Sequence, residues 1–549
     1  MCYNRFMKKH ILFFFSLLVV FSFASCTGKP ASPDSDIVIL YTNDVHCGVD
    51  ENIGYPGLAL YKKEMLEQTP YVTLVDAGDA VQGGIIGLFS HGSYIITLMN
   101  ELGYEVAVPG NHEFDYGMDR FKELSRMLKC GYISCNFRDK TGKLIFPAYK
   151  MLSFGKKKVA FVGICTPETK TKSTPHIFQD ENENFIYSFG GEDKGRVMYE
   201  EVQEAIDAAR KKGADYVILV GHLGERGVTK EWNSISVLSH ISGADAVIDG
   251  HSHEVTPSLL TADKTGKKIP VTQSGTKLAN IGKVTIAKDG TIKTELISSV
   301  PEKDGLKEDT SVAKTIADMK KEYSARFEKV IATVDFDLLA TDANKSWLVR
   351  HEETNLSDLF TDAMKEVLGT DICLLNAGSL RTNIESGEVS LGDIYDVYPF
   401  ENFACAYEIS GQTILDELEF GAKMMPGNDG GFLQTSGLTY KVNTSLPCGA
   451  QMNEDELFTG EVKGPYRVHD VMINGEKLDV TKTYTVASFD YAIKLNGDGH
   501  LFKGAKRISG GDKIAFDIFR EYITSLAEKN DGKIPEIYRE SQKRLVVEK

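Results

Sequence analysis

The chain has few cysteines, and it has too few basic residues to form an extended positively charged surface. Nine cysteines are scattered over 549 residues without a CxxC pair, which excludes a cysteine zinc ribbon and a CxxC redox motif. Lysine and arginine number 62 against 78 acidic residues, a net charge of −16, and this balance argues against nucleic acid as a partner. A phosphate-bearing substrate would have to be attracted by local charge.

The remaining composition is that of a soluble globular protein. Hydrophobic residues make up 42% and charged residues 26% of the chain, and no internal repeat or low-complexity tract is present. The length is too great for one core and predicts two or three domains. Most cysteines are expected to be small buried side chains. Cys130 and Cys135 could form a disulfide, and the sequence leaves this open.

The N-terminus has the pattern of an export signal. Lys8 and Lys9 precede an apolar run from Ile11 to Ala24, which is too short to span a membrane. The ending "FASC" resembles a bacterial lipobox and implies lipidation of Cys26, although Phe23 stands where Leu is more usual. We therefore expect a signal at 1–26, a tether at 27–35 and a lipid-anchored protein in the periplasm or on the cell surface. The alternative is an ordinary cleaved signal with a chance cysteine.

Short apolar runs alternate with longer amphipathic ones after this segment. Buried strands are expected at 36–42, 71–78, 159–166, 215–222 and 245–251. Helices are expected at 57–68 and 196–213, so the first domain, at 36–305, is a layered α/β domain. A linking helix at 306–329 carries Val312, Ile316, Met319, Tyr323 and Phe327 on one face. A second mixed α/β domain is expected at 330–549.

Polar side chains gather where the predicted strands of the first domain end. These residues are Asp44, His46, Asp76, Asp79, Asn111, His112, Asp115, His222, His251 and His253. Because the carboxyl ends of strands in α/β sheets meet at one edge, we expect these segments to lie together. A single Asp-x-His or His-x-His is more often a surface loop, and "GNHE" alone could be a turn. The whole series predicts a metal site.

The residue types indicate which metals such a site would hold. Carboxylate, imidazole and amide oxygen without thiolate suit Zn²⁺, Mn²⁺ or Co/Fe. The candidates are too many for one tetrahedral ion, and two ions about 3.5–4 Å apart would use them all.

The same series resembles the calcineurin-like metallophosphoesterases. "TNDVHCG", "GNHEFDYG" and "DGHSH" are similar to the 5′-nucleotidase and UDP-sugar hydrolase branch. The resemblance implies a β-sandwich flanked by helices and two metal ions that share Asp79. One ion would be bound by Asp44, His46, Asp79 and His253, and the other by Asp79, Asn111, His222 and His251. Some relatives have Gln or Asn in place of His253, which leaves the preferred metal open.

The resemblance gives His112 and Asp115 a different role. Asp115 would orient the imidazole and favour its charged form, and His112 would stabilise the transition state and protonate the leaving alkoxide. The alternative is a helix-capping Asp115 beside a structural His112. We expect Glu113 to be structural and Asp76 to support a ligand.

The second domain resembles the substrate-binding domain of the same branch. The resemblance implies nucleotide contacts by Arg350, Asn376 and Arg381, base stacking by Phe400 and ribose binding by Asp498. "NAGSLR" replaces two glycines of the family pattern Asn-Gly-Gly-Gly-Ile-Arg but keeps its Asn-to-Arg spacing. Tyr491 is the candidate for a second stacking aromatic, although it is one residue out of step. Phe400 could instead lie in the core, and Arg350 could form a surface ion pair.

These observations predict an exported, metal-dependent phosphohydrolase of the 5′-nucleotidase type. A UDP-sugar or 2′,3′-cyclic nucleotide hydrolase on the same scaffold is the nearest alternative. A thiosulfate-ester hydrolase is more distant, because Phe400 and Asp498 argue against it. A non-catalytic surface lipoprotein is a further alternative, which would tolerate losses among the metal ligands; none is missing here. The sequence does not indicate the oligomeric state.

Overall fold

The computed structural model describes residues 34–173, 175–180, 184–225, 229–300, 308–453 and 456–549. The expected signal, its Cys26 and most of the expected tether lie outside the described residues. Within the described part, no helix is both long and apolar enough to cross a bilayer. The described cysteines, Cys130 and Cys135 among them, are free thiols.

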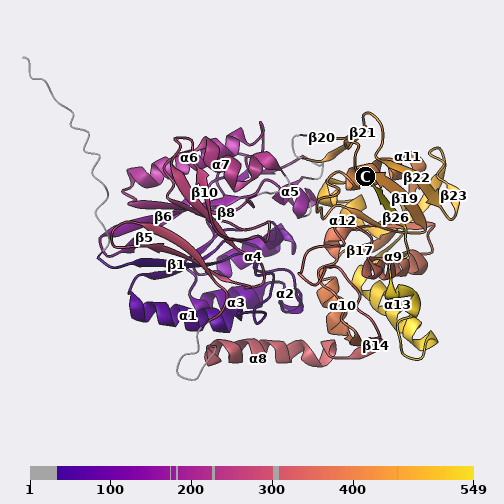
Figure 1. Cartoon of the computed structure of the whole chain (residues 1–549), viewed down its shortest axis with the longest axis horizontal. Helices are drawn as coiled ribbons and strands as arrows, with labels where there is room; N and C mark the ends of the chain where they lie inside the picture. Colours follow the sequence, from indigo (N-terminus) through magenta and orange to yellow (C-terminus); the bar gives the residue numbers. More distant parts are fainter. Residues whose placement is uncertain (1–33, 174, 181–183, 226–228, 301–307, 454–455) are drawn as a thin grey trace, which may run out of the picture. The chain divides into compact units, whose positions relative to one another are not determined.

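Two sheets form the first half of the structure (Figure 1). The first sheet has the order β13-β12-β1-β2-β3, with β1 (Ile37–Thr42), β2 (Val72–Asp76), β3 (Val106–Ala107), β12 (Ile281–Ile286) and β13 (Ile292–Ile297). The second has the order β10-β11-β9-β8-β6-β5, with β5 (Tyr149–Phe154), β6 (Lys157–Cys165), β8 (Tyr216–His222), β9 (Ala246–Ile248), β10 (Val255–Ala262) and β11 (Lys268–Ser274). Strands β1, β2 and β3 are parallel to one another, as are β6, β8 and β9.

Successive side chains along the strands of the second sheet pack alternately into two different cores. Phe161 of β6 and Ile218 of β8 belong to the core shared with the first sheet, whereas Val162 and Leu219 belong to a separate core under the helices on the outer face. This period of two is what a strand buried on both faces requires. The predicted sandwich is confirmed, and Tyr41 joins its sheets through a 2.7 Å hydrogen bond to Thr272.

Helices cover both outer faces of this sandwich, as Figure 1 shows. They are α1 (Gly54–Gln68), α2 (Ile85–Ser90), α3 (Ser93–Leu102), α4 (Met118–Met127), α6 (Arg196–Lys211) and α7 (Ser234–His240). One further turn, α5 (Thr169–Lys172), follows β6, and a short strand pair joins β4 (Arg138–Asp139) to β7 (Tyr187–Ser188).

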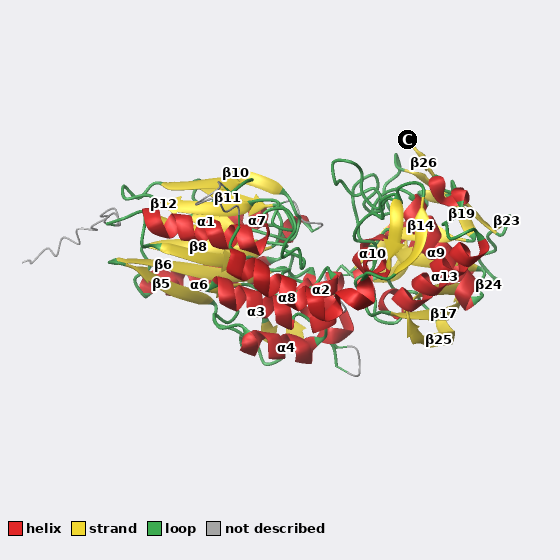
Figure 2. Ribbon diagram, turned by 90° about the horizontal axis from the view of Figure 1, so that it is seen from below, coloured by secondary structure: helices red, strands yellow, loops and turns green. Residues whose placement is uncertain are grey.

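The predicted linking helix is α8 (Thr310–Phe327). The Asp309 carboxylate caps its start by accepting hydrogen bonds from the backbone N–H groups of Ser311 and Val312. Val312, Ile316, Tyr323 and Phe327 are buried, and Met319 is partly buried. The helix packs on α1 and α3 (Figure 2) and also contacts α10 (Leu391–Val397) beyond it.

A second group of sheets follows α8. A mixed sheet has the order β18-β15-β24-β17-β25, with β15 (Ile372–Asn376), β17 (Phe403–Ser410), β18 (Leu433–Ser436), β24 (Thr483–Phe489) and β25 (Lys506–Ile514). A smaller sheet has the order β23-β22-β19-β26, with β19 (Leu438–Asn443), β22 (Val468–Ile473), β23 (Glu476–Lys477) and β26 (Leu545–Glu548). Two further pairs join β14 (Val330–Val334) to β16 (Gly387–Ser390) and β20 (Ala450–Met452) to β21 (Phe458–Val462).

Helices α9 (Asn355–Leu368) and α13 (Ala515–Lys529) pack on the mixed sheet, and α11 (Gly411–Gly421) contacts both sheets. The single turn α12 (Asp490–Ile493) follows β24. The loops that leave β15 and α12 carry several of the residues predicted to bind substrate. This architecture confirms the predicted mixed α/β class for the second half.

Candidate active site

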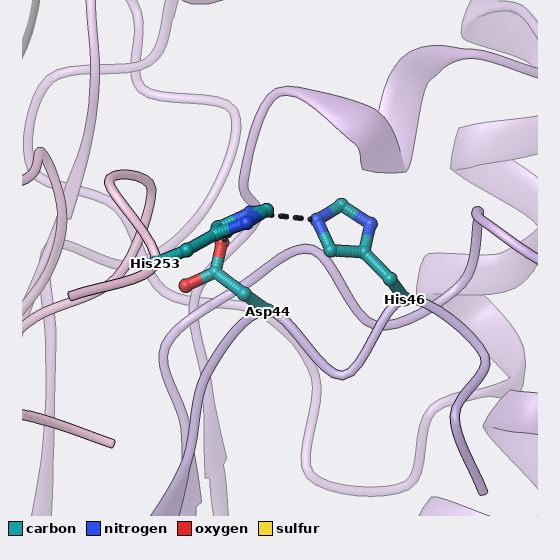
Figure 3. A group of neighbouring side chains, drawn as sticks. All are labelled: Asp44, His46 and His253. Atoms are coloured by element: carbon teal, nitrogen blue, oxygen red, sulfur yellow. Dashed lines mark hydrogen bonds and ion pairs between the residues drawn. The ribbon is translucent and has the colours of Figure 1, made fainter. Parts of the chain in front are cut away.

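The polar residues of the first half converge because their strands are parallel neighbours. Asp44 and His46 follow β1, Asp79 follows β2, and Asn111 follows β3. His222 is the last residue of β8, and His251 and His253 follow β9. The structure forms two groups whose ligand atoms lie within 4.8 Å of one another, and each could hold a metal ion. They are Asp44, His46 and His253 (Figure 3), and Asp79, His222 and His251.

The facing atoms in these groups are those that a cation would bind. Nε2 of His46 lies 3.1 Å from Nε2 of His253, which in turn lies 3.4 Å from Oδ1 of Asp44. Oδ2 of Asp79 lies 3.1 Å from Nε2 of His222 and 3.7 Å from Nε2 of His46, so this carboxylate adjoins both groups. Asn111 Oδ1 is 3.3 Å from the same His222 nitrogen. Imidazole nitrogens, carboxylates and an amide oxygen fit divalent transition metals.

Backbone conformation at this site is unusual. Asp44, His46, Asp79, His251 and His253 have φ values of 50°, 44°, 58°, 79° and 58°. Left-handed conformations are rare for residues other than glycine, and they persist only where the surrounding structure enforces them. The fold therefore accepts local strain to bring these side chains together.

Hydrogen bonds fix which ring nitrogen faces the site. The Nδ1–H groups of His46 and His222 donate to the backbone carbonyls of Gln82 at 3.0 Å and Ala77 at 2.7 Å, which leaves Nε2 free to bind a metal. His251 differs, because its Nε2–H donates to the Glu168 carboxylate at 2.8 Å and Nδ1 is left free.

Glu113 holds the loop that carries Asp79. Its carboxylate accepts hydrogen bonds from the backbone N–H groups of Asp79 and Ala80 at 2.8 Å and of Gly110 at 2.6 Å. Glu113 thus connects the loops after β2 and β3, which is a structural role. The Asp76 carboxylate makes a comparable local bond to the N–H of Gly78 at 3.1 Å.

His112 and Asp115 form a pair beside these groups. His112 Nδ1–H donates to Asp115 Oδ2 at 2.6 Å, and Ser173 donates to the other carboxylate oxygen at 3.0 Å. Burial disfavours a charged imidazole, but Asp115 and Asp79 outweigh burial and raise the pKa of His112 above its usual value. The backbone N–H of His112 also donates to Asp79 Oδ1 at 2.8 Å, which fixes the pair relative to the metal groups.

One cavity of about 400 Å³ is lined by residues from both halves of the chain. From the first half it is lined by Asp79, Asn111, His112, Asp115, His251 and His253. All six residues predicted to bind substrate also line it, namely Arg350, Asn376, Arg381, Phe400, Tyr491 and Asp498. Asp44, His46 and His222 are buried and are not among the lining residues.

Asp498 and its neighbours form an ordered polar group in this cavity. Asp498 lies in a short turn with a φ of 54°, and its Oδ2 accepts a 2.8 Å hydrogen bond from Asn376 Nδ2. Ser379 donates to Asn376 Oδ1 at 2.6 Å. The hydroxyl of Tyr491 accepts a 3.2 Å hydrogen bond from the backbone N–H of Asp498.

The two arginines lie near Trp347. The guanidinium carbons of Arg350 and Arg381 are 4.1 Å and 5.9 Å from the centre of the indole ring, within cation–π distance. Burial and the neighbouring Arg381 lower the pKa of Arg350 to about 9, and its buried Nε has no hydrogen-bond partner among the described residues. This end of the cavity is suited to an anionic group.

Sequence reasoning missed Glu168, Lys172 and Trp347, all of which line the cavity. Glu168 could have been found, because it follows β6 just as the predicted ligands follow their strands. Lys172 lies one turn later, in α5, and no periodic signal marks it. Trp347 lies in a loop before α9 and is likewise unmarked.

Comparisons with known proteins identify the family of each half of the chain. The calcineurin-like phosphoesterase family matches residues 37–255, and the 5′-nucleotidase C-terminal domain family matches residues 330–507. A trifunctional nucleotide phosphoesterase protein of Bacillus subtilis is 24% identical across 92% of this chain, and the chain spans 35% of that longer protein. A 5′-nucleotidase of Bos taurus is 25% identical, with 86% of this chain and 85% of the relative covered.

The crystal structure of a 5′-nucleotidase precursor from Thermus thermophilus has the same fold. Its TM-score is 0.77 at 23% identity, and the match covers 93% of this chain and 99% of the other. The chain therefore belongs to the metal-dependent phosphoesterases in which a calcineurin-like domain is joined to a 5′-nucleotidase C-terminal domain.

Proposed function

We propose that this protein is an exported 5′-nucleotidase, which hydrolyses the phosphate ester of nucleotides with a water activated by two divalent metal ions. The observation that carries the proposal is the cavity of about 400 Å³. It joins members of both candidate metal groups to arginines, aromatic rings and a carboxylate from the second half of the chain.

Each end of the cavity supplies part of the proposed substrate site. Phe400 and Tyr491 would stack on the base, since aromatic faces accept any base. Asp498 would accept hydrogen bonds from the ribose hydroxyls, and Asn376 would donate a hydrogen bond to the ribose. Arg350 and Arg381 would contact the phosphate, for which planar guanidinium groups are suited.

The metal ligands would be those that the motifs suggest, with Asp79 shared. One ion would be held by Asp44, His46, Asp79 and His253, and the other by Asp79, Asn111, His222 and His251. Such ions lower the pKa of a bound water and offset the charge of the phosphoryl oxygens.

His112 would supply the proton for the leaving group. Its Nδ1–H is engaged by Asp115, so Nε2 is the nitrogen that can face the substrate. A charged imidazole carries a proton there, which it can donate to a phosphoryl oxygen or to the departing alkoxide. Ser173 and Asp115 keep the ring in this orientation.

We also propose that the protein is anchored by a lipid on Cys26. The apolar run and the "FASC" sequence support this proposal. The mature chain would then comprise a tether at 27–35, a metallophosphoesterase domain at 36–305, a linking helix at 306–329 and a substrate-binding domain at 330–549.

A substrate panel with defined metals tests the proposed activity. Protein purified in chelator is assayed with AMP, other 5′-monophosphates, ATP, UDP-glucose, 2′,3′-cyclic AMP and an aryl phosphate, before and after addition of Mn²⁺, Zn²⁺ or Co²⁺. We expect hydrolysis only with metal, and fastest for 5′-monophosphates. Activity indifferent to chelation would refute the metal-dependent mechanism.

The other outcomes of the panel identify the alternatives. Preference for UDP-glucose or for the cyclic nucleotide would identify the related activity on the same scaffold. Metal binding without turnover of any ester would indicate a non-catalytic binding protein.

A further inference from the structure

Lys172 joins the two halves of the cavity. It is the last residue of α5, in the first half of the chain, yet its Nζ lies 3.3 Å from Oδ1 of Asp429 and 3.5 Å from Oδ1 of Asp498 in the second half. The side chains of Asp429 and Asp498 are almost completely buried, with exposed fractions of 1% and 6%, whereas Lys172 is 16% exposed; all three residues line the cavity.

The two carboxylates differ in what else supports them. Asp429 also pairs with Lys423 and accepts a 3.0 Å hydrogen bond from the N–H of Gly431. Asp498 has Asn376 on its other oxygen, and Lys172 is the one cation in ion-pair distance of it among the described residues. Loss of Lys172 would therefore leave Asp429 paired but Asp498 without a counter-ion.

Burial makes this difference important. A buried carboxylate without a partner is strongly disfavoured in its charged form. Burial also works against the charge of Lys172, but Asp429 and Asp498 hold the pKa of this lysine above its usual value. The cluster of Lys172, Lys423, Asp429 and Asp498 is neutral in total, so it attracts no phosphate by itself.

The contacts of Asp498 leave acceptor capacity for two hydroxyl groups. An ionised carboxylate has about four lone-pair positions, two on each oxygen. Asn376 donates a hydrogen bond to Oδ2, and Lys172 lies in ion-pair distance of Oδ1. Both oxygens can therefore accept further hydrogen bonds, and a carboxylate with this capacity can bind the two hydroxyls of a ribose diol.

We propose that Lys172 is a positioning residue that holds the Asp498 carboxylate in the orientation that a ribose diol requires, and so makes the site select ribonucleotides over simple phosphate esters. This inference rests on the proposed nucleotidase function and adds to it the residue that sets sugar selectivity. Because Lys172 belongs to the metal-binding half, sugar recognition depends on contact between the halves.

Lys172→Met tests the inference with AMP, 2′-deoxy-AMP and an aryl phosphate as substrates. We expect KM for AMP to rise about 10- to 100-fold, the effect of leaving a buried carboxylate without its counter-ion. The preference for AMP over 2′-deoxy-AMP should disappear, while kcat and KM for the aryl phosphate stay within about threefold of the wild type.

Lys423→Met is the matched control. It removes the other lysine of the same cluster but leaves the Lys172–Asp498 contact intact. The preference for AMP over 2′-deoxy-AMP should persist in this variant. Lys172→Arg keeps the positive charge and should retain part of the preference. This variant distinguishes loss of the charge from misfolding of Lys172→Met. Calorimetric binding of adenosine in the presence of chelator gives a readout independent of catalysis, and Lys172→Met should weaken it.

Three outcomes would overturn the inference. They are an equal loss for the aryl phosphate, an unchanged preference for the ribose in Lys172→Met, and the same loss of preference in Lys423→Met. A wild-type protein that hydrolyses the aryl phosphate but no nucleotide would refute the proposed function instead. Adenosine binding would then still decide the role of Lys172.

Discussion

The metal end and the nucleoside end of the cavity are built in different ways. Asp44, Asp79 and His222 follow or end parallel strands, are almost fully buried and have neighbours within the same half of the chain. Asp498 and Phe400 lie in loops, and Asp498 takes its counter-ion from Lys172 in the other half. The metal end is therefore fixed by sheet topology, whereas the nucleoside end is completed by contacts between loops.

This difference predicts different responses to mutation. Changes at the metal end should reduce turnover of every phosphate ester, because all substrates would share the metal ions and His112. Changes at the nucleoside end should affect nucleotides more than simple esters. The effect should be mainly on KM, because these changes remove contacts that bind the ground state and the transition state equally.

Asp79→Asn should have the largest effect. Asp79 adjoins both metal groups, so its loss should weaken both and lower kcat/KM by about 1,000-fold or more for AMP and aryl phosphate alike. Metal content by mass spectrometry and steady-state kinetics measure this. Asp498→Asn is the counterpart at the other end and should keep full metal content while raising KM for AMP alone. Full metal content in Asp79→Asn would argue against a shared ligand.

His112→Ala should separate chemistry from metal binding at the same end. We expect kcat to fall about 100- to 1,000-fold, the range for loss of a general acid, with both metals retained. The exposed His240, which stacks on Tyr199 and is not among the cavity-lining residues, provides the control variant His240→Ala. If metal content falls in His112→Ala, this histidine is a ligand and the division of roles is wrong.

The strand-end residues could be predicted from the sequence because the fold leaves them little freedom. Each follows an apolar run, and parallel strands carry their ends to one edge. The sequence predicts a structural role for Glu113 but not its partners. Its hydrogen bonds to the N–H groups of Asp79, Ala80 and Gly110 depend on how two loops meet.

Contacts at the nucleoside end are harder to predict from the sequence. The residues resembling the family motif, such as Asn376 and Asp498, do line the cavity. The pairing of Lys172 with Asp498 joins segments far apart in the chain, and each residue lies in a single helical turn that is too short for a periodic signal. Trp347 carries no local signal either. Contacts of this kind follow from loop conformation, which composition and periodicity do not determine.

Glu168→Ala should show whether the metal end depends on residues behind the ligands. Glu168 accepts the hydrogen bond of His251 Nε2 at 2.8 Å and orients the ring, so its loss should weaken metal binding about 10- to 100-fold. Competition with a fluorescent chelator measures this. Glu168→Gln should retain most of the affinity, because its amide oxygen still accepts. The control is Glu225→Ala, a buried glutamate bonded to Thr256. Equal losses in both alanine variants would indicate general destabilisation.

Phe400→Ala should have the smallest effect and the most selective one. Stacking of a base on an aromatic ring contributes about 1–3 kcal/mol, so KM for AMP should rise about tenfold with kcat little changed. The aryl phosphate, which has no nucleobase, should lose much less. Phe403 is the matched control, since it is 42% exposed in β17 and is not among the cavity-lining residues. Phe403→Ala should leave both substrates unaffected. An equal rise in KM for AMP and the aryl phosphate in Phe400→Ala would mean that the ring shapes the cavity rather than binding the base, and that the selectivity of the nucleoside end resides in Asp498 and Tyr491.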